Sequence, residues 1–228
     1  MELDADQQAV VIDFQGARSV VSGPGSGKTT TMVELVHNLL QSGISPSDVR
    51  AVTFSKEMAI VLERRIGVKG VASTFHSLGY LICSETERKP VEPELRHRLM
   101  CKLVRKWGLE YKELDNFIAR MRRENINPDA CAECGDYSYS AASAYGEYER
   151  VRAQEGWMDF DSMLADAVQA LEKKTVRIRW QPKYLIVDEA QDTDDCQWRM
   201  MQLMAERHGN ITVVGDPNQA IWIPWSKA

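Results

Sequence analysis

The sequence has no apolar run long enough to span a membrane, and its first residues, Met1 to Asp6, are polar and acidic, unlike a secretory signal. These two absences predict a cytoplasmic protein without a membrane partner. Positive charge is not in excess either, because 28 basic residues stand against 33 acidic residues, a net charge of −5. Such a chain has no overall attraction for nucleic acid, so any contact with DNA must use a local patch.

Cysteine is scarce, and its count of five is odd. Without a signal peptide, this count argues against a framework of disulfides. Cys131 and Cys134 have the spacing of metal ligands, but a zinc site needs two more ligands. His97 and Cys101 could supply them, although nothing in their spacing requires it. The simpler interpretation is a pair of reduced thiols near a turn.

The arrangement of apolar residues predicts a parallel sheet interrupted by a helical block. Short β-rich runs predict strands at residues 18–21, 50–54, 71–74, 184–187 and 211–214. Apolar residues at helical spacing predict helices over residues 28–41 and 56–66. Strands that are separated by helices form parallel sheets covered on both faces. We therefore expect an α/β fold.

Residues 80–155 have a different character, with Leu95, Leu99 and Leu103 spaced as on one face of a helix. We expect a small helical insertion here, within an α/β domain formed by residues 1–79 and 156–228. Five basic residues lie on its first predicted helix, Arg96, Arg98, Lys102, Arg105 and Lys106. Such a row is more often a solvated face than a phosphate-binding surface.

A phosphate-binding loop is indicated between the first predicted strand and the helix that follows it. The loop reads Ser22-Gly-Pro-Gly-Ser-Gly-Lys-Thr29, and its predicted nucleotide contacts are Gly23, Gly25, Ser26, Gly27, Lys28, Thr29 and Thr30. Glycines let backbone N–H groups turn towards phosphate oxygens, lysine reaches the β- and γ-phosphates, and the Thr29 hydroxyl can bind Mg²⁺. The alternative is a flexible glycine-rich turn, since Ser22 stands where the strict pattern has glycine.

An apolar strand, residues 185–187, ends in two carboxylates, Asp188 and Glu189. Beside a phosphate-binding loop, Asp188 could hold Mg²⁺ and Glu189 could orient the attacking water. Alone the pattern is weak, because strands often end in Asp where a loop begins. Together with the loop, it favours ATP hydrolysis over binding alone.

Several ordered stretches then resemble the motifs of superfamily 1A helicases, the UvrD/Rep group. The run Asp188-Glu-Ala-Gln-Asp192 resembles the second helicase motif, and Val214 to Trp222 resembles the third. Further similar stretches begin at Leu3, Thr53, Ser73 and Met158. The resemblance implies a P-loop NTPase of RecA-like fold, with the insertion at the place of the family's subdomain 1B, and ATP and Mg²⁺ as cofactors.

The resemblance also assigns roles to individual residues. Gln7 would contact adenine and Gln219 would sense the γ-phosphate. Single-stranded DNA would be contacted by Thr53, Phe54, Thr74, His76, Trp222 and Trp225. Simpler alternatives remain for some of these stretches: Gln7 as an ordinary polar helix residue, Phe54 and Phe75 as core aromatics at strand ends, His76 as a structural histidine or a helix-start residue, and Trp222 as a packing residue.

Three features depart from the family pattern. Glu57 stands where the family has a lysine shortly after the position of Phe54, and Ser226 stands where the family has an arginine. The second motor domain, which carries the arginine fingers, is expected to be absent.

We therefore expect the ATP-binding motor domain of a DNA helicase that translocates on single-stranded DNA, incomplete by itself. A separate second motor domain or a homodimer could complete it. One alternative is a non-catalytic ATP- or DNA-binding module that docks a partner. A further alternative is an unrelated P-loop ATPase, although the ordered helicase-like motifs argue against it.

Overall fold

A computed structural model describes residues 3–23, 25–133, 135, 137–177 and 180–216. The chain divides into two compact units. The first unit comprises Met1–Leu78, Val176–Asp194 and Met200–Ala228, and the second comprises Gly79–Thr175 and Asp195–Arg199. Among the described residues, no helix is both long enough and apolar enough to cross a membrane.

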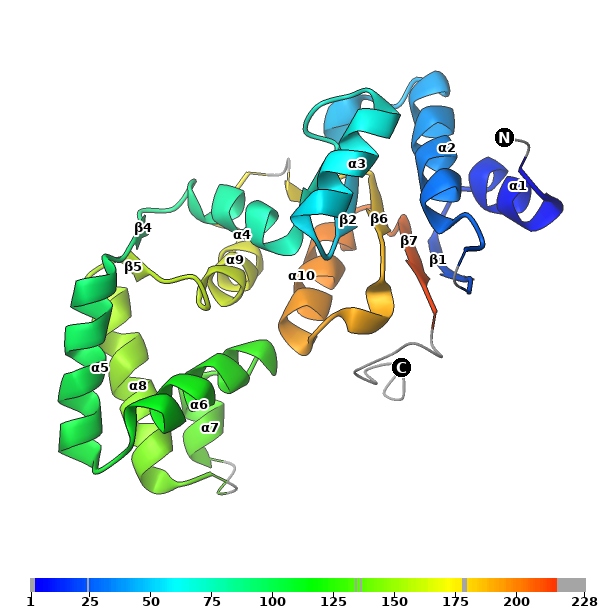
Figure 1. The fold of residues 1–228 in the computed structure, drawn as a ribbon. Coiled ribbons are helices and arrows are strands. Elements are labelled where there is room, and N and C mark those ends of the chain that lie inside the picture. Colours follow the sequence, from blue (N-terminus) through cyan, green and yellow to red (C-terminus); the bar gives the residue numbers. More distant parts are fainter. Residues whose placement is uncertain (1–2, 24, 134, 136, 178–179, 217–228) are drawn as a thin grey trace. The chain divides into compact units, whose positions relative to one another are not determined.

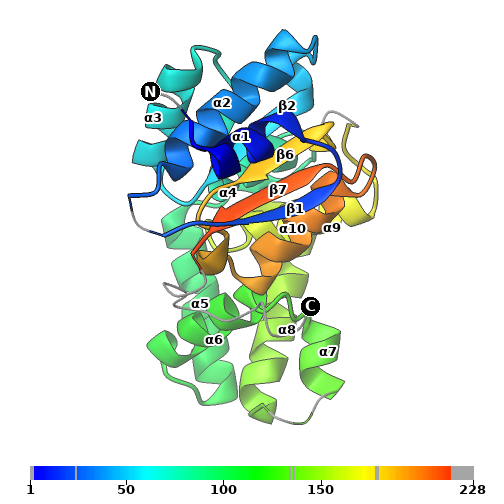
Figure 2. The ribbon, with the colours of Figure 1, turned by 90° about the vertical axis from the view of Figure 1, so that its right-hand side faces the viewer.

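The first unit is built on a parallel sheet of five strands in the order β1-β7-β6-β2-β3. Figure 2 shows β1, β7, β6 and β2 side by side in this order. The strands are β1 (Ala17–Val21), β2 (Val49–Thr53), β3 (Ala72–Thr74), β6 (Tyr184–Val187) and β7 (Ile211–Gly215). Because all neighbouring pairs are parallel, the carboxyl ends of the strands meet at one edge of the sheet. Residues that follow different strands in the sequence therefore gather at this edge.

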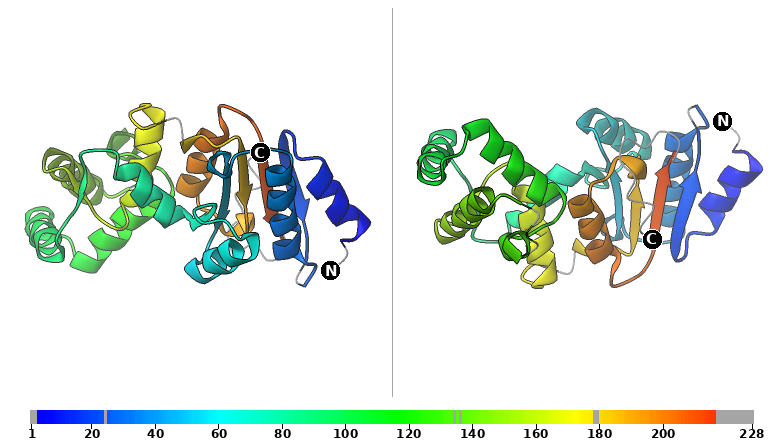
Figure 3. Two further views of the ribbon diagram at one scale, coloured as in Figure 1. Left: turned by 90° about the horizontal axis from the view of Figure 1, so that it is seen from above. Right: turned by 90° about the horizontal axis from the view of Figure 1, so that it is seen from below.

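Helices cover both faces of the sheet. Figures 2 and 3 show α1 (Ala5–Ile12), α2 (Lys28–Gln41) and α3 (Lys56–Ile66) on one side, and on the other the part of α10 (Asp195–Ala205) that belongs to this unit, from Met200 on. Side chains of α2 and α3, among them Met32, Leu35 and Leu62, pack with sheet residues such as Ala51 and Ile186 into one core. The prediction of an α/β fold with a parallel sheet flanked by helices is confirmed.

Local sequence sets the ends of α3, which the apolar spacing predicted at these limits. The Ser55 side chain accepts a hydrogen bond from the backbone N–H of Met58 and caps the first turn. The helix ends where Gly67 adopts φ 76°, a left-handed conformation that side chains disfavour. The residues at its two ends thus fix the length of α3 between β2 and β3.

The second unit is mainly helical (Figure 1). Its helices are α5 (Pro93–Trp107), α6 (Tyr111–Arg123), α7 (Pro128–Glu133), α8 (Tyr139–Gln154) and α9 (Met163–Glu172), while α4 (Phe75–Cys83) begins in the first unit. Its core contains Met100, Leu103, Ile118, Met121 and Tyr148, all at most 2% exposed. This core has no residue in common with the core of the first unit, so each unit has its own apolar centre.

The second unit contains all of the expected insertion, residues 80–155, and continues to Thr175. Backbone pairing explains this extension, because β4 (Lys89–Pro90) and β5 (Trp157–Met158) form a two-stranded parallel sheet. An ion pair also binds α9 to α8, with Arg152 Nη1 2.6 Å from Asp166 Oδ2. These contacts join partners far apart in the sequence, which spacing along the chain does not reveal.

Candidate functional site

The glycine-rich loop between β1 and α2 leaves its backbone open on one side. Gly25 and Gly27 have φ angles of 73° and 81°, and nothing lies within 4 Å of the place where a Cβ of Gly23 or Gly25 would stand. The Ser26 hydroxyl donates to Gly23 O at 2.7 Å, and Ser22 N donates to Gly215 O at 3.0 Å. The loop is thus anchored to β7 while its tip stays accessible, which suits a phosphate group.

Helix α2 begins inside this loop. Gly27 is its N-cap residue and supplies no side-chain hydrogen bond to the first turn. The first turn also contains no acidic side chain, so the partial positive charge of the helix end is not offset there. The Thr30 hydroxyl accepts a hydrogen bond from Arg65 Nη2 of α3 at 3.1 Å. An anion at this helix end would therefore meet unsatisfied backbone N–H groups.

The predicted lysine and carboxylate come together at the carboxyl edge of the sheet. Lys28 Nζ lies 3.1 Å from Glu189 Oε2, and their side chains are 13% and 35% exposed. Glu189 has φ 48°, a left-handed conformation that costs energy for a residue with a side chain. The chain thus holds Glu189 in a strained position facing the phosphate-binding loop.

Asp188 precedes Glu189 and is 3% exposed. Its backbone N–H donates to Val52 O at 2.8 Å, and its side chain accepts from Glu189 N at 3.0 Å. Burial and then the charge of the neighbouring Glu189 carboxylate raise the pKa of Asp188, the backbone N–H of Glu189 and the charge of Lys28 lower it, and the net result is a pKa of about 6. A bound cation would offset both the burial and the repulsion, so this carboxylate fits a Mg²⁺ ligand.

The described residues contain no group of three or more His, Cys, Asp or Glu side chains that could hold a metal by themselves. A Mg²⁺ site made of one or two carboxylates together with substrate phosphates needs no such group. Cys101 Sγ lies 3.4 Å from His97 Nε2, and Cys131 is buried in the core of the second unit. Cys134 lies outside the described residues.

Gln191 is a site residue to which sequence reasoning gave no role beyond its place in the second helicase-like motif. It lies on η3 (Ala190–Asp192), directly after the two carboxylates, and is 3% exposed. Its Nε2 donates to Glu189 Oε2 at 2.7 Å, and its Oε1 accepts from Asp216 N at 3.0 Å. The amide therefore links the carboxylate of Glu189 to the end of β7.

Gln7 connects the first helix to the phosphate-binding loop. Asp4 and Gln7 form a reciprocal capping box at the start of α1. The Gln7 Nε2 also donates to Ser26 O at 2.8 Å. The side chain predicted to contact adenine therefore touches the loop predicted to hold the phosphates.

The predicted DNA-contacting residues at β2 and β3 have diverse surroundings. Phe54 is 59% exposed, so the core-packing alternative does not apply to it, whereas Phe75 is 3% exposed. Thr53 is 1% exposed, and its hydroxyl has no hydrogen-bond partner within the described part of the chain. The Thr74 hydroxyl lies 2.9 Å from that of Ser77 and accepts from its backbone N–H, which places it at the start of α4 with His76.

A cavity of ≈340 Å³ is lined by residues of both predicted groups, the DNA-contacting and the catalytic residues. It lies beside the end of β2 and the residues that follow β6, and Phe54 and Glu189 both line it. The remaining lining residues are Thr53, Ser55, Met58, Gln191 and Asp192. A ligand in this cavity would thus contact residues from the predicted DNA-binding and catalytic groups. Gln219, Trp222 and Trp225 lie outside the described residues.

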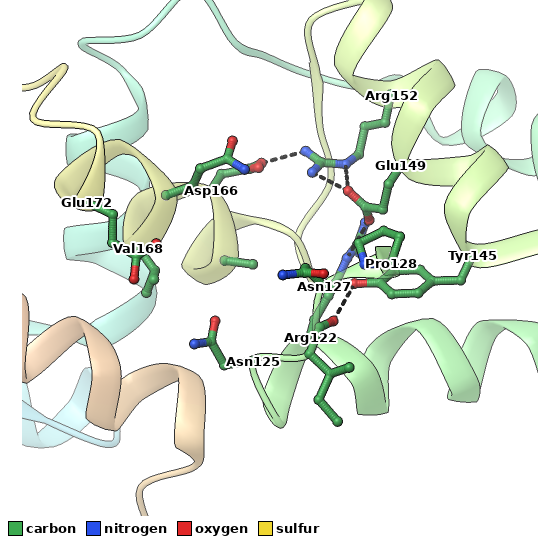
Figure 4. Close-up of a pocket in the computed structure, with 13 residues that line it drawn as sticks. Arg122, Asn125, Asn127, Pro128, Tyr145, Glu149, Arg152, Asp166, Val168 and Glu172 are labelled. Carbon is green, nitrogen blue, oxygen red and sulfur yellow. Dashed lines mark hydrogen bonds and ion pairs between the residues drawn. The ribbon is translucent and has the colours of Figure 1, made fainter. Parts of the chain in front are cut away.

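The short stretch Met158–Met163 lies in the second unit. Asp159 receives hydrogen bonds from Arg122 Nη1 at 2.8 Å and Tyr148 OH at 2.6 Å. Arg152 pairs with Glu149 and Asp166 beside a cavity of ≈270 Å³ (Figure 4). These buried charges pair with one another within the unit, so this stretch binds the unit together internally.

The basic row on α5 is partly used within the second unit. Arg96 Nη2 lies 2.6 Å from Asp115 Oδ1, and Lys106 Nζ lies 2.6 Å from Glu147 Oε2. Arg98, Lys102 and Arg105 are exposed. The solvated-face interpretation fits these three, while the other two stabilise helix packing.

The chain is similar to known proteins over nearly all of its length. A family model, the UvrD/REP helicase N-terminal domain, matches residues 3–228. The ATP-dependent DNA helicase PcrA of Staphylococcus epidermidis is 26% identical over 96% of this chain and 34% of its own length. The ATP-dependent DNA helicase Rep of Buchnera aphidicola subsp. Acyrthosiphon pisum is 27% identical over 97% of this chain and 38% of its own length.

The chain spans about a third of the length of the curated relatives it matches. The matched region nevertheless includes both the glycine-rich loop and the acidic end of β6. On the family match, the chain belongs to the UvrD/REP helicase N-terminal domain family.

Proposed function

We propose that this chain binds Mg·ATP at the carboxyl edge of its sheet and hydrolyses it to drive movement on single-stranded DNA. The observation that carries the proposal is the 3.1 Å approach of Lys28 Nζ to Glu189 Oε2, beside an open glycine-rich loop. A lysine for the phosphates and a carboxylate for the attacking water are the two charges that ATP hydrolysis needs at one place. The names of the relatives support ATP and DNA as substrates.

Each residue has a role in this proposal. Lys28 and the backbone of Gly23, Gly25, Ser26, Gly27 and Thr30 bind the phosphates. Thr29 and Asp188 hold Mg²⁺, which when bound neutralises charge on the β- and γ-phosphates. Glu189 orients the attacking water, and Gln219 senses the γ-phosphate. Since Lys28 pairs with Glu189 in this structure, binding ATP requires Lys28 to exchange the carboxylate for phosphate oxygens.

Gln7 is proposed to recognise adenine. An amide can donate to and accept from the same edge of adenine. In this structure the Gln7 amide donates to Ser26 O and accepts from Asp4 N. Because it already touches the phosphate-binding loop, the base and the phosphates would be read by connected parts of the chain.

Single-stranded DNA is proposed to cross the ends of β2 and β3, where Thr53, Phe54, Thr74 and His76 lie. Trp222 and Trp225 complete the proposed contact. Exposed aromatic rings stack on bases, and this needs no positive net charge. A second motor domain is proposed to supply the other wall of the ATP cleft, whether it belongs to the same polypeptide, to a separate chain or to a homodimer partner.

The experiment measures Mg·ATP affinity by calorimetry for the wild-type chain, Lys28→Ala and Lys102→Ala. Lys102 is an exposed lysine of the second unit and serves as the matched control. We expect Lys28→Ala to lose at least about tenfold in affinity, since removing one charge-assisted hydrogen bond costs about 1.5–3 kcal/mol. Equal affinities for the three proteins would refute the proposed site. Binding without hydrolysis under any condition would favour a non-catalytic module.

A further inference from the structure

The buried carboxamide of Gln191 has a fixed orientation. Asp216 N is a backbone donor, so the atom that faces it at 3.0 Å must be the acceptor, Oε1. The Nε2 group is then necessarily turned to Glu189 Oε2, 2.7 Å away. The side chain cannot be reversed without placing two donors against each other. The backbone of β7 thus dictates that Glu189 receives a donor from Gln191.

Gly215 provides the space for this arrangement. A Cβ at position 215 would collide with Oε1 of Gln191, which lies directly against the glycine backbone. Gly215 is the last residue of β7 and pairs with Val21, the residue before the glycine-rich loop. The end of β7 is therefore shaped around the Gln191 carboxamide, between the loop and the carboxylates.

Within the described chain, the side chains that donate to Glu189 Oε2 are those of Lys28 and Gln191. These two donors differ in charge and mobility. Lys28 is a long cation that, under the proposed function, turns to the phosphates. Gln191 is neutral, 3% exposed and held at its other end by Asp216. When Lys28 turns to the phosphates, Gln191 is the one of these two donors that still holds the Glu189 carboxylate.

We propose that Gln191 is a positioning residue that holds the Glu189 carboxylate for the attack of water on ATP. This inference rests on the proposed function, since it needs Glu189 to act on the reaction. The strained backbone of Glu189, at φ 48°, adds to the need for a second restraint. A neutral amide restrains the carboxylate without adding a net charge beside it.

The test is single-turnover hydrolysis of radiolabelled Mg·ATP by excess full chain, together with ATP affinity from calorimetry. Gln191→Met removes both hydrogen bonds at similar volume. Gln191→Glu keeps the acceptor for Asp216 N but replaces the donor with a charge that repels Glu189. We expect both variants to lower the hydrolysis rate about 10- to 100-fold, as for other residues that orient a reacting group. Their ATP affinity should change by less than about threefold, because the loss falls on the chemical step.

Two controls separate positioning from general damage. Gln181→Met removes a hydrogen bond to Leu203 O before the start of β6, at the other end of that strand, and should leave the rate unchanged. Gly215→Ala leaves the Gln191 carboxamide chemically unchanged but displaces it by collision with the new Cβ, and should reproduce the slow rate. Thermal midpoints for all variants show whether each chain is folded.

The outcomes distinguish the two proposals. A wild-type rate no higher than that of Glu189→Gln would overturn the proposed function, and the role of Gln191 with it. A wild-type rate above that floor, matched by Gln191→Glu, would overturn the positioning role alone. A slow rate in Gln191→Glu with an equal loss of ATP affinity would also overturn it, because the residue would then act in binding.

Discussion

At the residue scale, Phe54 and Phe75 show how similar positions acquire different roles. Each follows the last residue of a strand, β2 or β3, and the two strands are neighbours in the sheet. Phe54 is 59% exposed, while Phe75 is 3% exposed. The ring of Phe54 is accessible to a stacking base, and the ring of Phe75 contributes to the core. The two residues therefore form a matched pair for experiment.

We expect Phe54→Ala to weaken binding of a labelled oligonucleotide by about 1–3 kcal/mol, the contribution of one stacked base. Its free energy of unfolding should stay close to that of the wild type. Phe75→Ala should instead lower the free energy of unfolding by about 3–5 kcal/mol through loss of a buried ring. Anisotropy titration at fixed salt and urea denaturation measure the two quantities. Unchanged DNA affinity in Phe54→Ala would remove this residue from the proposed DNA contact.

Gln7 offers a second prediction at this scale. The wild-type chain should prefer ATP to GTP, and Gln7→Ala should lose that preference because the amide that pairs with adenine is gone. Asp4→Ala is the control, since it breaks the same capping box but leaves the Gln7 amide in place. Calorimetry measures the ATP and GTP affinities of the wild type, Gln7→Ala and Asp4→Ala. A preference that survives in Gln7→Ala would show that another group reads the base.

At the element scale, buried charges bind the helices of the second unit to one another. Arg122 of α6 lies 2.8 Å from Asp159, which follows β5, and 2.6 Å from Glu149 of α8. Burial alone would raise the pKa of Asp159, but the charge of Arg122 and the Tyr148 hydrogen bond lower it to about 2. The ionised form of this carboxyl is thus stabilised in the folded chain.

Asp159→Asn should lower the free energy of unfolding by on the order of 3 kcal/mol near neutral pH, because Arg122 loses a buried partner. Asp161→Asn, at a side chain 46% exposed in the same turn, should change it by less than about 0.5 kcal/mol. Urea denaturation compares them with the wild type. Equal stability of the two variants would show that this ion pair contributes little.

The pH dependence of this difference has a definite sign. A lowered pKa in the folded chain gives stability that is complete above the unfolded value, near 3.8, and is lost as the pH falls towards 2. The gap between wild type and Asp159→Asn should therefore close between about pH 5 and pH 2. A gap that stays constant over this range would contradict the ionised pair.

The sequence predicts those parts of the molecule that depend on neighbouring residues. The limits of α3 follow from Ser55 and Gly67, and the glycine-rich loop is recognisable because its function depends on a local run of residues. Gln191 was missed because its role depends on Asp216, 25 positions away, and on the missing Cβ of Gly215. The buried pairs of Arg122 were missed for the same reason, since charge spacing along a chain does not identify distant partners.

At the scale of the whole molecule, the chain carries one wall of the proposed ATP cleft and spans about a third of its relatives' length. The residues at the edge of its sheet supply Lys28, Asp188 and Glu189 from one side. The proposed second motor domain would add positive charge from the other side. Arginine fingers of this kind contribute about 10³–10⁵ in rate, or about 4–7 kcal/mol of barrier.

The most direct test of the account is the ATPase rate of the purified chain with single-stranded DNA, before and after a separate second motor domain is added. The account predicts slow turnover by the chain alone, still above that of Glu189→Gln, and a large increase when the second domain is present. Turnover that equals that of Glu189→Gln under both conditions would contradict catalysis by this site. Rapid DNA-stimulated turnover by the monomeric chain alone, abolished by Glu189→Gln, would contradict the requirement for a second wall.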